Sequence, residues 1–265
     1  MIEMTEQITP EIVRLTLDKE RWYFLDGTPH PSVTWILQYM PKGHWFYVWL
    51  ADKMHSYDEV RHILQSRGEE GTMAHWGMER YVLGENVTYH DEHPEFHRGY
   101  TPKEWEMVLA GKRWCDAFEP VIRSVEQAVF GSIPGPYAGT VDLDVLIDGA
   151  KFGTKKNPYP YGEGQLECVL DWKTSQAIYD SHRTQVASYA HSIKPKVIGI
   201  IRLGSRHKTG YEFWHGGQGE MFKYFHLFKA AYAFWAHEHG DTEPKIVEYP
   251  SSININPEGE KNVEI

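Results

Sequence analysis

Two carboxylates and a lysine, each at the end of an apolar run, are the residues in this sequence best suited to metal-dependent hydrolysis. Asp171 and Lys173 follow the apolar segment 168–170, and Asp142 follows the segment 139–141. Successive side chains of a strand point to opposite faces, so Asp171 and Lys173 should lie on the same face. Two carboxylates on neighbouring strands could bind Mg²⁺, and the lysine could orient or help deprotonate an attacking water.

Each of these residues also has a simpler interpretation. Asp171 and Lys173 could form only a surface ion pair, and Asp142 could close a turn. A third segment argues for function, because Gln185-x-x-x-Tyr189 follows in a stretch with helical spacing. Three segments of these types in this order favour a phosphodiester hydrolase site over chance.

The elements that must position these residues are predicted from periodicity and turn residues. Helices are expected at 67–83, 101–121, 181–193 and 219–239, and an aromatic-rich helical region begins at 31–37 and continues to Trp49. Thr101 and Pro102 have the types of an N-cap and a first helical residue. Strands are expected at 125–130, 137–147, 166–171, 197–203 and 211–214, with a turn at 131–135. Asp142 and Asp171 therefore belong to consecutive strands, which antiparallel pairing would make neighbours.

This order of elements predicts a mixed α/β (α+β) fold, with a mixed central sheet flanked by helices. We expect one domain at 1–240, with a mainly helical part at 1–121 and a catalytic α/β core at 122–240. A polar C-terminal tail is expected at 241–265. Such a core supports many functions, so function must be argued from the site.

The composition excludes several classes of protein. Two cysteines are too few for a disulfide framework, or for an iron–sulfur or zinc site with four cysteines. No segment approaches the ~20 apolar residues of a membrane span. The acidic N-terminus lacks the features of a secretory signal, so we expect a cytoplasmic protein with no membrane partner. The net charge of −10 disfavours general binding to DNA, although bound cations would reverse the charge near a carboxylate site.

The segments that could do chemistry resemble the RecB-like branch of the PD-(D/E)XK nucleases. Asp142, Asp171-x-Lys173 and Gln185-x-x-x-Tyr189 match its core motifs. Segment 67–75 matches its helix with a metal-binding histidine, and segment 125–126 matches its glutamate-bearing strand. Segments 31–37 and 171–175 are most similar to those of the mitochondrial genome maintenance exonuclease and its phage and bacterial relatives. The similarity runs in patches from Pro31 to Tyr189.

The resemblance implies a restriction-endonuclease-like PD-(D/E)XK core, a helical N-terminal part and one or two Mg²⁺ or Mn²⁺ ions, without an iron–sulfur cluster. It implies that His75, Asp142 and Asp171 bind metal. It also implies a catalytic group of Asp142, Asp171, Lys173 and Glu126. Gln185 and Tyr189 would support the site and the DNA backbone, while Ser32 and Thr34 would lie near the bound strand.

Alternatives stay open for several of these residues. His75 could be a structural histidine, Glu126 a solvated edge residue, Tyr189 a packing residue and Ser32 a helix N-cap. The segment 151–164, expected within a long hairpin, carries Lys155 and Lys156 among aromatic residues. That composition suits single-strand binding, and the alternative is a solvent-exposed hairpin with turn residues.

The function expected from these features is a metal-dependent DNA exonuclease that acts on single-stranded or frayed ends in replication, recombination or repair. One alternative is an endonuclease of the same superfamily, either structure-specific or restriction-type. The other is a DNA-binding module without catalysis. DNA is the expected partner in each case, and a phage-encoded enzyme would work in the host cytoplasm.

Overall fold

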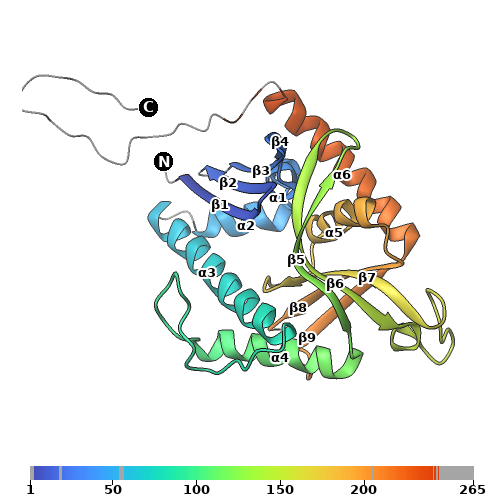
Figure 1. Ribbon diagram of the computed structural model, residues 1–265. Helices are drawn as coiled ribbons and strands as arrows, with labels where there is room; N and C mark the ends of the chain where they lie inside the picture. The colour runs from blue at the N-terminus through green and yellow to red at the C-terminus, as the bar shows by residue number, and fades with distance from the viewer. Residues whose placement is uncertain are drawn as a thin grey trace, which may run out of the picture.

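The computed structural model describes residues 3–17, 20–53, 57–204, 206–240, 242 and 244. The tail expected at 241–265 therefore lies almost entirely outside the described residues. The described part combines a four-stranded sheet, a five-stranded sheet and helices, which confirms the expected mixed α/β (α+β) class (Figure 1).

The five-stranded sheet carries the carboxylates of interest, and its order is β5-β6-β7-β8-β9. Its strands are β5 (Val121–Gly131), β6 (Tyr137–Asp148), β7 (Gln165–Lys173), β8 (Val197–Leu203) and β9 (Tyr211–Gly216). Neighbouring strands are antiparallel except β7 and β8, which are parallel and joined through helix α5 (Asp180–Ile193). A mixed sheet with β6 beside β7 is the arrangement expected from the sequence.

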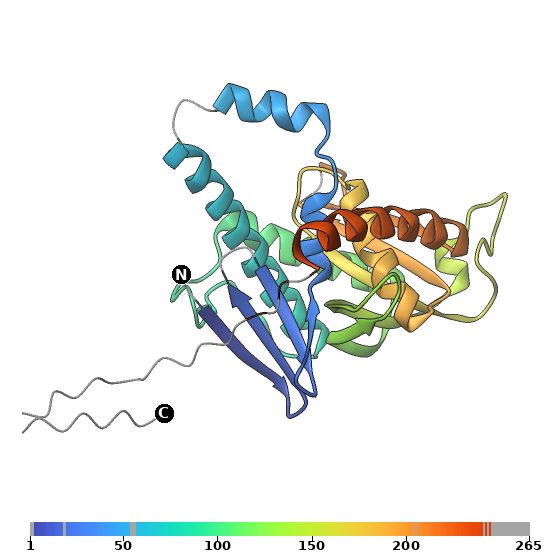
Figure 2. The same ribbon diagram turned by 90° about the horizontal axis from the view of Figure 1, so that it is seen from above.

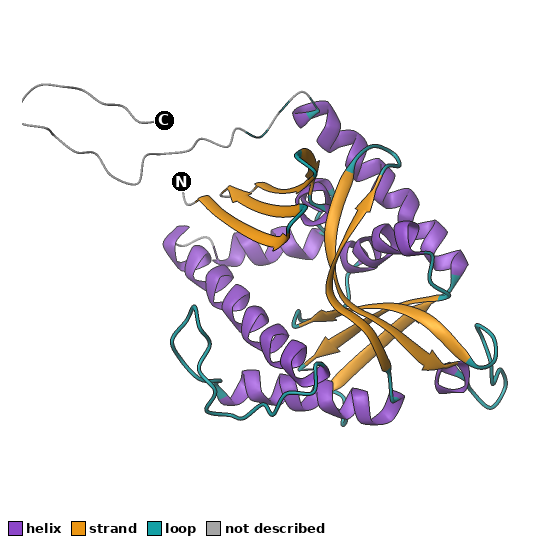
Figure 3. Ribbon diagram, viewed as in Figure 1, coloured by secondary structure: helices purple, strands orange, loops and turns teal. Residues whose placement is uncertain are grey.

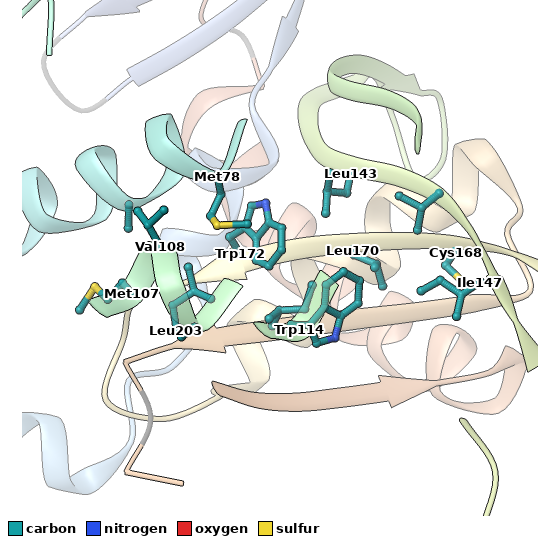
Figure 4. Packing of buried hydrophobic residues seen from close by; sticks show 14 of the residues in the cluster. Met78, Met107, Val108, Trp114, Leu143, Ile147, Cys168, Leu170, Trp172 and Leu203 are labelled. Carbon is teal, nitrogen blue, oxygen red and sulfur yellow. The ribbon is translucent and has the colours of Figure 1, made fainter. Parts of the chain in front are cut away.

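Helices cover both faces of this sheet. On one face, α3 (Tyr57–Val82) and α4 (Pro102–Phe118) bury residues such as Met78 and Trp114 against Leu170 and Trp172 (Figure 4). On the other face, α5 and α6 (Gln218–His239) pack over β8, as Figure 3 shows. Strand β8 is apolar along almost its whole length because both of its faces are buried.

Helix α4 begins where its sequence predicts. Thr101 is the N-cap, and its hydroxyl accepts a hydrogen bond from the backbone N–H of Glu104, while the Glu104 carboxylate accepts one from the N–H of Thr101. The helix ends at Phe118 rather than at 121, because Glu119 adopts a left-handed conformation with φ of 50°. Val121 already belongs to β5.

The expectation of a mainly helical part at 1–121 is wrong for the described residues 3–17 and 20–31. These residues form an antiparallel sheet of β1 (Glu3–Thr9), β2 (Ile12–Leu17), β3 (Glu20–Leu25) and β4 (Thr28–Pro31). A signal for it was present in the sequence. Asp26 and Gly27 connect β3 to β4, both with positive φ, and Asp-Gly is a preferred pair for such a two-residue hairpin turn.

Helices follow this small sheet, as expected. The short helix α1 (Val33–Ile36) runs into a 3₁₀ turn, η1 (Leu37–Tyr39), and α2 (His44–Lys53) precedes α3. Seen from above, α2 and the N-terminal half of α3 extend beyond the sheets (Figure 2). None of the helices in the described ranges has the length and apolar character needed to cross a membrane.

Aromatic packing attaches the small sheet to the rest of the molecule. Trp22 of β3, Trp35 of α1 and Trp235 of α6 meet edge to face, with ring centroids 5.1 to 6.2 Å apart. The hydroxyls of Tyr23 and Thr140 lie 2.9 Å apart, which ties β3 to β6. The small sheet therefore packs directly beside the strand that carries Asp142.

Candidate active site

The site is located where β6 leaves β7. The two strands pair in register from Asp148 and Gln165 to Leu143 and Leu170. Asp142 and Asp171 are the next residues along each strand, and beyond them β6 bends away with β5 toward the small sheet (Figure 1). The carboxylate of Asp142 accepts a hydrogen bond of 2.8 Å from the backbone N–H of Trp172. The side chain of Asp142 thus satisfies a backbone group of β7 just beyond the paired region.

Asp171 and Lys173 lie on one face of β7, as alternation predicts. The Lys173 ammonium forms an ion pair with the Asp171 carboxylate, and the Asp171 side chain is 1% exposed. Trp172, between them, points to the opposite face and packs edge to face on Trp114, with ring centroids 5.6 Å apart. Anchoring of the Trp172 ring in the core therefore helps to hold both charged side chains toward the site.

His75 joins this group from α3, far away in the sequence. Its Nδ1 atom lies 3.4 Å from Oδ2 of Asp142. Met73, Ala74 and Met78 of the same helix are buried in the core, and this packing fixes the rotation of the helix about its axis. Burial, followed by the nearby Lys173 charge, lowers the pKa of His75 to about 4, so the ring is neutral at pH 7. A neutral imidazole is the form that binds metals.

Glu126 contributes a third carboxylate from β5. It stands between Val125 and Gln127, whose partners on β6 are the two neighbours of Asp142, so it lies opposite Asp142. Its φ of 50° is unusual for a strand residue other than glycine. His75, Glu126 and Asp142 each offer one ligand atom, and these atoms all lie within 4.8 Å of one another.

This donor set fits a divalent cation. Carboxylate oxygens suit Mg²⁺ and Mn²⁺, and an imidazole nitrogen is a common ligand of the transition metals. Within the described residues, Oδ1 of Asp171 is buried and has no hydrogen-bond partner. A buried carboxylate oxygen without a partner costs free energy unless a cation satisfies it. Asp171 therefore completes the set of candidate ligands.

The electrostatics of this site are unfavourable without a cation. Burial, together with the charges of Asp142, Glu79 and Asp171, raises the pKa of Glu126 to about 8. Burial also raises the pKa of Asp142 and of Asp171 to about 6 each, although Lys173 opposes this. Burial alone would lower the pKa of Lys173, but the negative charges of these carboxylates have the larger effect, so its pKa is raised. A cation placed here would relieve the repulsion among the carboxylates.

Glu79, which the sequence analysis did not single out, affects the carboxylates of the site through its charge. It follows His75 by four residues on α3, so the two side chains lie on one face of the helix. Its charge raises the pKa of both Glu126 and Asp142, and its own pKa is raised, first by burial and then by Glu85. The sequence did contain a signal for this, because a histidine and a glutamate four residues apart lie on the same face of a helix.

Gln185 and Tyr189 lie on α5, and Tyr189 packs against β6. The Gln185 amide donates a hydrogen bond of 2.9 Å to the Tyr189 hydroxyl, and Tyr189 is 2% exposed. Tyr189 therefore has the role of a packing residue, which was one of its two interpretations. It lies against Gly139 of β6, where a Cβ atom would come within 2.4 Å of the tyrosine ring. Glycine at this position lets β6 approach α5.

Ser32 and Thr34 are not brought to the carboxylate group. The Ser32 hydroxyl caps α1 by accepting a hydrogen bond of 3.1 Å from the N–H of Trp35, so its simpler interpretation is the one observed. The backbones of Ser32 and Ala138 form an isolated β-bridge. Ala138 precedes Asp142 by four residues, a distance of about 13 Å along β6. Thr34 is exposed and stays a candidate contact for a bound strand.

Lys155 and Lys156 are exposed, and they lie at the other end of the sheet. Asp148 follows Asp142 by six residues along β6, so the connection after it lies about 20 Å from the carboxylates. Instead of a regular hairpin, this connection starts with a 3₁₀ turn, η2 (Gly149–Phe152), and continues as an irregular loop. Lys151 pairs with Glu119 at 2.6 Å, which ties the loop to the end of α4.

Comparison with known proteins assigns no family. No protein-family model and no curated protein matches the chain. Among solved structures, the crystal structure of SSO0001 is similar at 9% sequence identity and a TM-score of 0.29. The match covers 48% of this chain and 57% of that chain, so it spans little more than half of SSO0001. A likeness this weak carries no argument about fold or function.

Proposed function

We propose that this chain is a metal-dependent DNA exonuclease with a PD-(D/E)XK-type site, which hydrolyses phosphodiester bonds at single-stranded or frayed ends. One observation carries the proposal. Asp142, Asp171, Glu126, His75 and Lys173 come from four different elements, yet they converge where β6 leaves β7. Carboxylates, a neutral imidazole and an ammonium together are suited to hydrolysis of a phosphate ester.

His75, Asp142 and Asp171 would hold the metal, with Glu126 beside them. When bound, Mg²⁺ or Mn²⁺ would supply positive charge to stabilise the attacking and leaving oxygens. Lys173 is next to Asp171, so its ammonium can donate a hydrogen bond to the attacking water or to a phosphate oxygen. The Asp142 carboxylate keeps its hydrogen bond to the N–H of Trp172, which fixes its orientation.

The preference for a free DNA end is supported by the position of α3. One half of this helix carries His75, and the other half extends beyond the sheets beside α2 (Figure 2). We propose that this projecting pair of helices covers a bound single strand. A covered strand has to enter by its end, so an unfrayed duplex and a closed circle would be poor substrates. Replication, recombination or repair would provide such ends.

Cleavage of linear and circular DNA tests the proposal. End-labelled single-stranded and double-stranded molecules, each as a circle and as the same molecule linearised, are incubated with Mg²⁺, Mn²⁺ or EDTA. We expect degradation of linear single strands with either metal, none with EDTA, and resistance of the circle. Asp171→Asn provides the matched inactive control, because it removes the charge and keeps the size of the side chain.

The other outcomes separate the alternatives. Rapid cutting of the single-stranded circle would assign the chain as an endonuclease. DNA binding without cleavage by either metal would assign a binding module. If the protein neither binds nor cleaves any of the four DNA molecules, the proposal is overturned.

A further inference from the structure

A basic cleft lies at the C-terminal ends of β7 and β8. It has a volume of about 600 Å³ and is lined by Gln176, Arg202, Gly204, Arg206 and His207. The lining comes from the end of β8, from the connection between β8 and β9, and from the segment that follows β7. None of these residues was assigned a role from the sequence.

The cleft borders the candidate metal site. Lys173 and Arg202 are register partners on the parallel strands β7 and β8, so their Cα atoms are about 5 Å apart. Paired residues of neighbouring strands project from the same face of a sheet. Gln176 follows Lys173 by three residues. The metal site thus lies on the β6 side of β7, and the cleft opens on its β8 side.

The cleft differs in charge from the protein as a whole. Residues 202–212 contain three cations, Arg202, Arg206 and Lys208, and one carboxylate, Glu212, in a chain with a formal net charge of −10. The carboxylate offsets one cation, because Arg202 Nε donates a hydrogen bond of 2.8 Å to Glu212. Residues 202–212 therefore carry a net charge of +2, close to the site where an anionic substrate would react.

The connection that carries Arg206 and Lys208 is held in place. Arg113 of α4 donates a hydrogen bond of 2.7 Å to the backbone carbonyl of Thr209, and the N–H of Gly210 donates one of 2.8 Å to the carbonyl of His207. Gly210 adopts a φ of 78°, which a residue with a side chain rarely tolerates. The basic side chains are therefore presented by a turn fixed on α4.

We infer that this cleft binds the phosphodiester backbone of the substrate strand next to the bond that is cleaved. The inference rests on the proposed nuclease function and names the surface that holds its substrate. The N–H donors of a guanidinium group form a fork, and this fork, together with the amide of Gln176, matches the oxygens of a phosphate. The cleft also explains how an acidic chain can bind a polyanion, since the contact needs only a local basic surface.

The test compares two double variants that lose the same charge. Arg206→Ala with Lys208→Ala removes one cation that lines the cleft and one that follows it by two residues on the same connection. Lys155→Ala with Lys156→Ala removes two cations at the far end of the sheet. Binding of a fluorescein-labelled single-stranded oligonucleotide is measured by anisotropy over a range of salt concentrations, with Ca²⁺ replacing Mg²⁺. Steady-state cleavage with Mg²⁺ is measured on the same oligonucleotide.

We expect an effect only at the cleft. Loss of two phosphate contacts should reduce the slope of log affinity against log salt by about 1.4, and the affinity at 0.1 M salt by roughly 25-fold. KM should rise by a similar factor with kcat nearly unchanged. The charge-retaining pair Arg206→Lys and Lys208→Arg should restore most of the affinity, and this pair separates loss of charge from local misfolding.

Two results would overturn the inference while leaving the nuclease proposal intact. The first is that the wild-type protein cleaves DNA while the cleft variant has the same salt dependence of affinity and the same KM as the wild-type protein. The second is that the variant at Lys155 and Lys156, and not the cleft variant, binds DNA more weakly than the wild-type protein. If the wild-type protein neither binds nor cleaves DNA, both proposals fail together.

Discussion

The carboxylate of Asp142 accepts a hydrogen bond of 2.8 Å from the backbone N–H of Trp172, and this contact bridges β6 and β7 where their backbones separate. Trp172 is flanked by Asp171 and Lys173. One side chain therefore joins the two strand ends that carry the charged groups. Asp142 has two roles, as a hydrogen-bond acceptor within the fold and as a candidate metal ligand, and these roles can be separated by mutation.

Asp142→Asn should abolish cleavage without unfolding the protein. An asparagine oxygen can still accept the hydrogen bond from Trp172, while the negative charge needed for the metal is lost. Burial raises the pKa of Asp142 to about 6, so the charge is unfavourable in the metal-free protein. We therefore expect an unchanged or higher melting temperature in EDTA, and a fall in kcat of about two orders of magnitude or more.

Thermal unfolding with and without Mn²⁺ measures both effects of Asp142→Asn. Stabilisation of the wild-type protein by Mn²⁺ should disappear in the variant, because a ligand that binds only the folded state raises its stability. Asp148→Asn is the matched control, since Asp148 is exposed at the other end of the same strand. Wild-type cleavage by the Asp142 variant would refute the assignment of the metal site.

Lys173→Met should lower kcat by roughly a hundredfold to a thousandfold and leave KM almost unchanged. In the proposed mechanism, the ammonium next to Asp171 acts on the water or on the charge of the transition state, whereas methionine keeps only the bulk of the side chain. Single-turnover and steady-state kinetics measure the two parameters. Lys173→Arg keeps the charge and should retain more activity than the methionine variant. A rise in KM alone would assign Lys173 to substrate binding instead.

Glu79→Gln should weaken Mn²⁺ binding by about fivefold, less than the tenfold or greater loss expected for His75→Ala. Glu79 acts on Glu126 and Asp142 through its charge, whereas His75 offers a ligand atom. Isothermal titration calorimetry measures both affinities. Glu69→Gln, a half-buried position six residues before His75 on the same helix, is the control and should bind Mn²⁺ like the wild-type protein. Equal affinities for the Glu79 and Glu69 variants would remove Glu79 from the site.

Glu104→Gln should reduce the free energy of unfolding by about 1–3 kcal/mol at pH 7. The carboxylate is 1% exposed and accepts two hydrogen bonds of 2.9 Å from Arg98, as well as one from the N–H of Thr101. Burial raises the pKa of Glu104, but the hydrogen bonds from Arg98 and Thr101 outweigh it, so the net shift is downward.

The sign of that shift sets the pH dependence. A lowered pKa in the folded state means that the carboxylate stabilises the protein above its ordinary pKa of about 4.3. The contribution is lost as the pH falls through the lower, folded value. Urea unfolding of both proteins between pH 7 and pH 3 should therefore show a difference that shrinks in acid. A difference independent of pH would mean that the charge of Glu104 is not what stabilises α4.

Local features of the structure were predictable from the sequence because they depend on residues close together in the chain. The alternation of Asp171, Trp172 and Lys173 determined which side chains share a face of β7. Thr101 and Glu104 determined the start of α4. The small N-terminal sheet was missed, although the Asp26-Gly27 pair in its last hairpin has a strong turn preference.

Contacts between distant segments were decided only by the tertiary structure. His75 and Asp142 are 67 positions apart in the sequence, and their contact depends on how α3 packs against the sheet. The pairing of β6 with β7 stops just before Asp142 and Asp171, and no single segment encodes where the two strands separate. The same holds for the basic cleft, where register pairs Arg202 with Lys173 while Lys155 and Lys156 lie at the opposite end of the sheet. Periodicity specifies which way a side chain points within its own element, whereas the packing of elements determines which side chains meet.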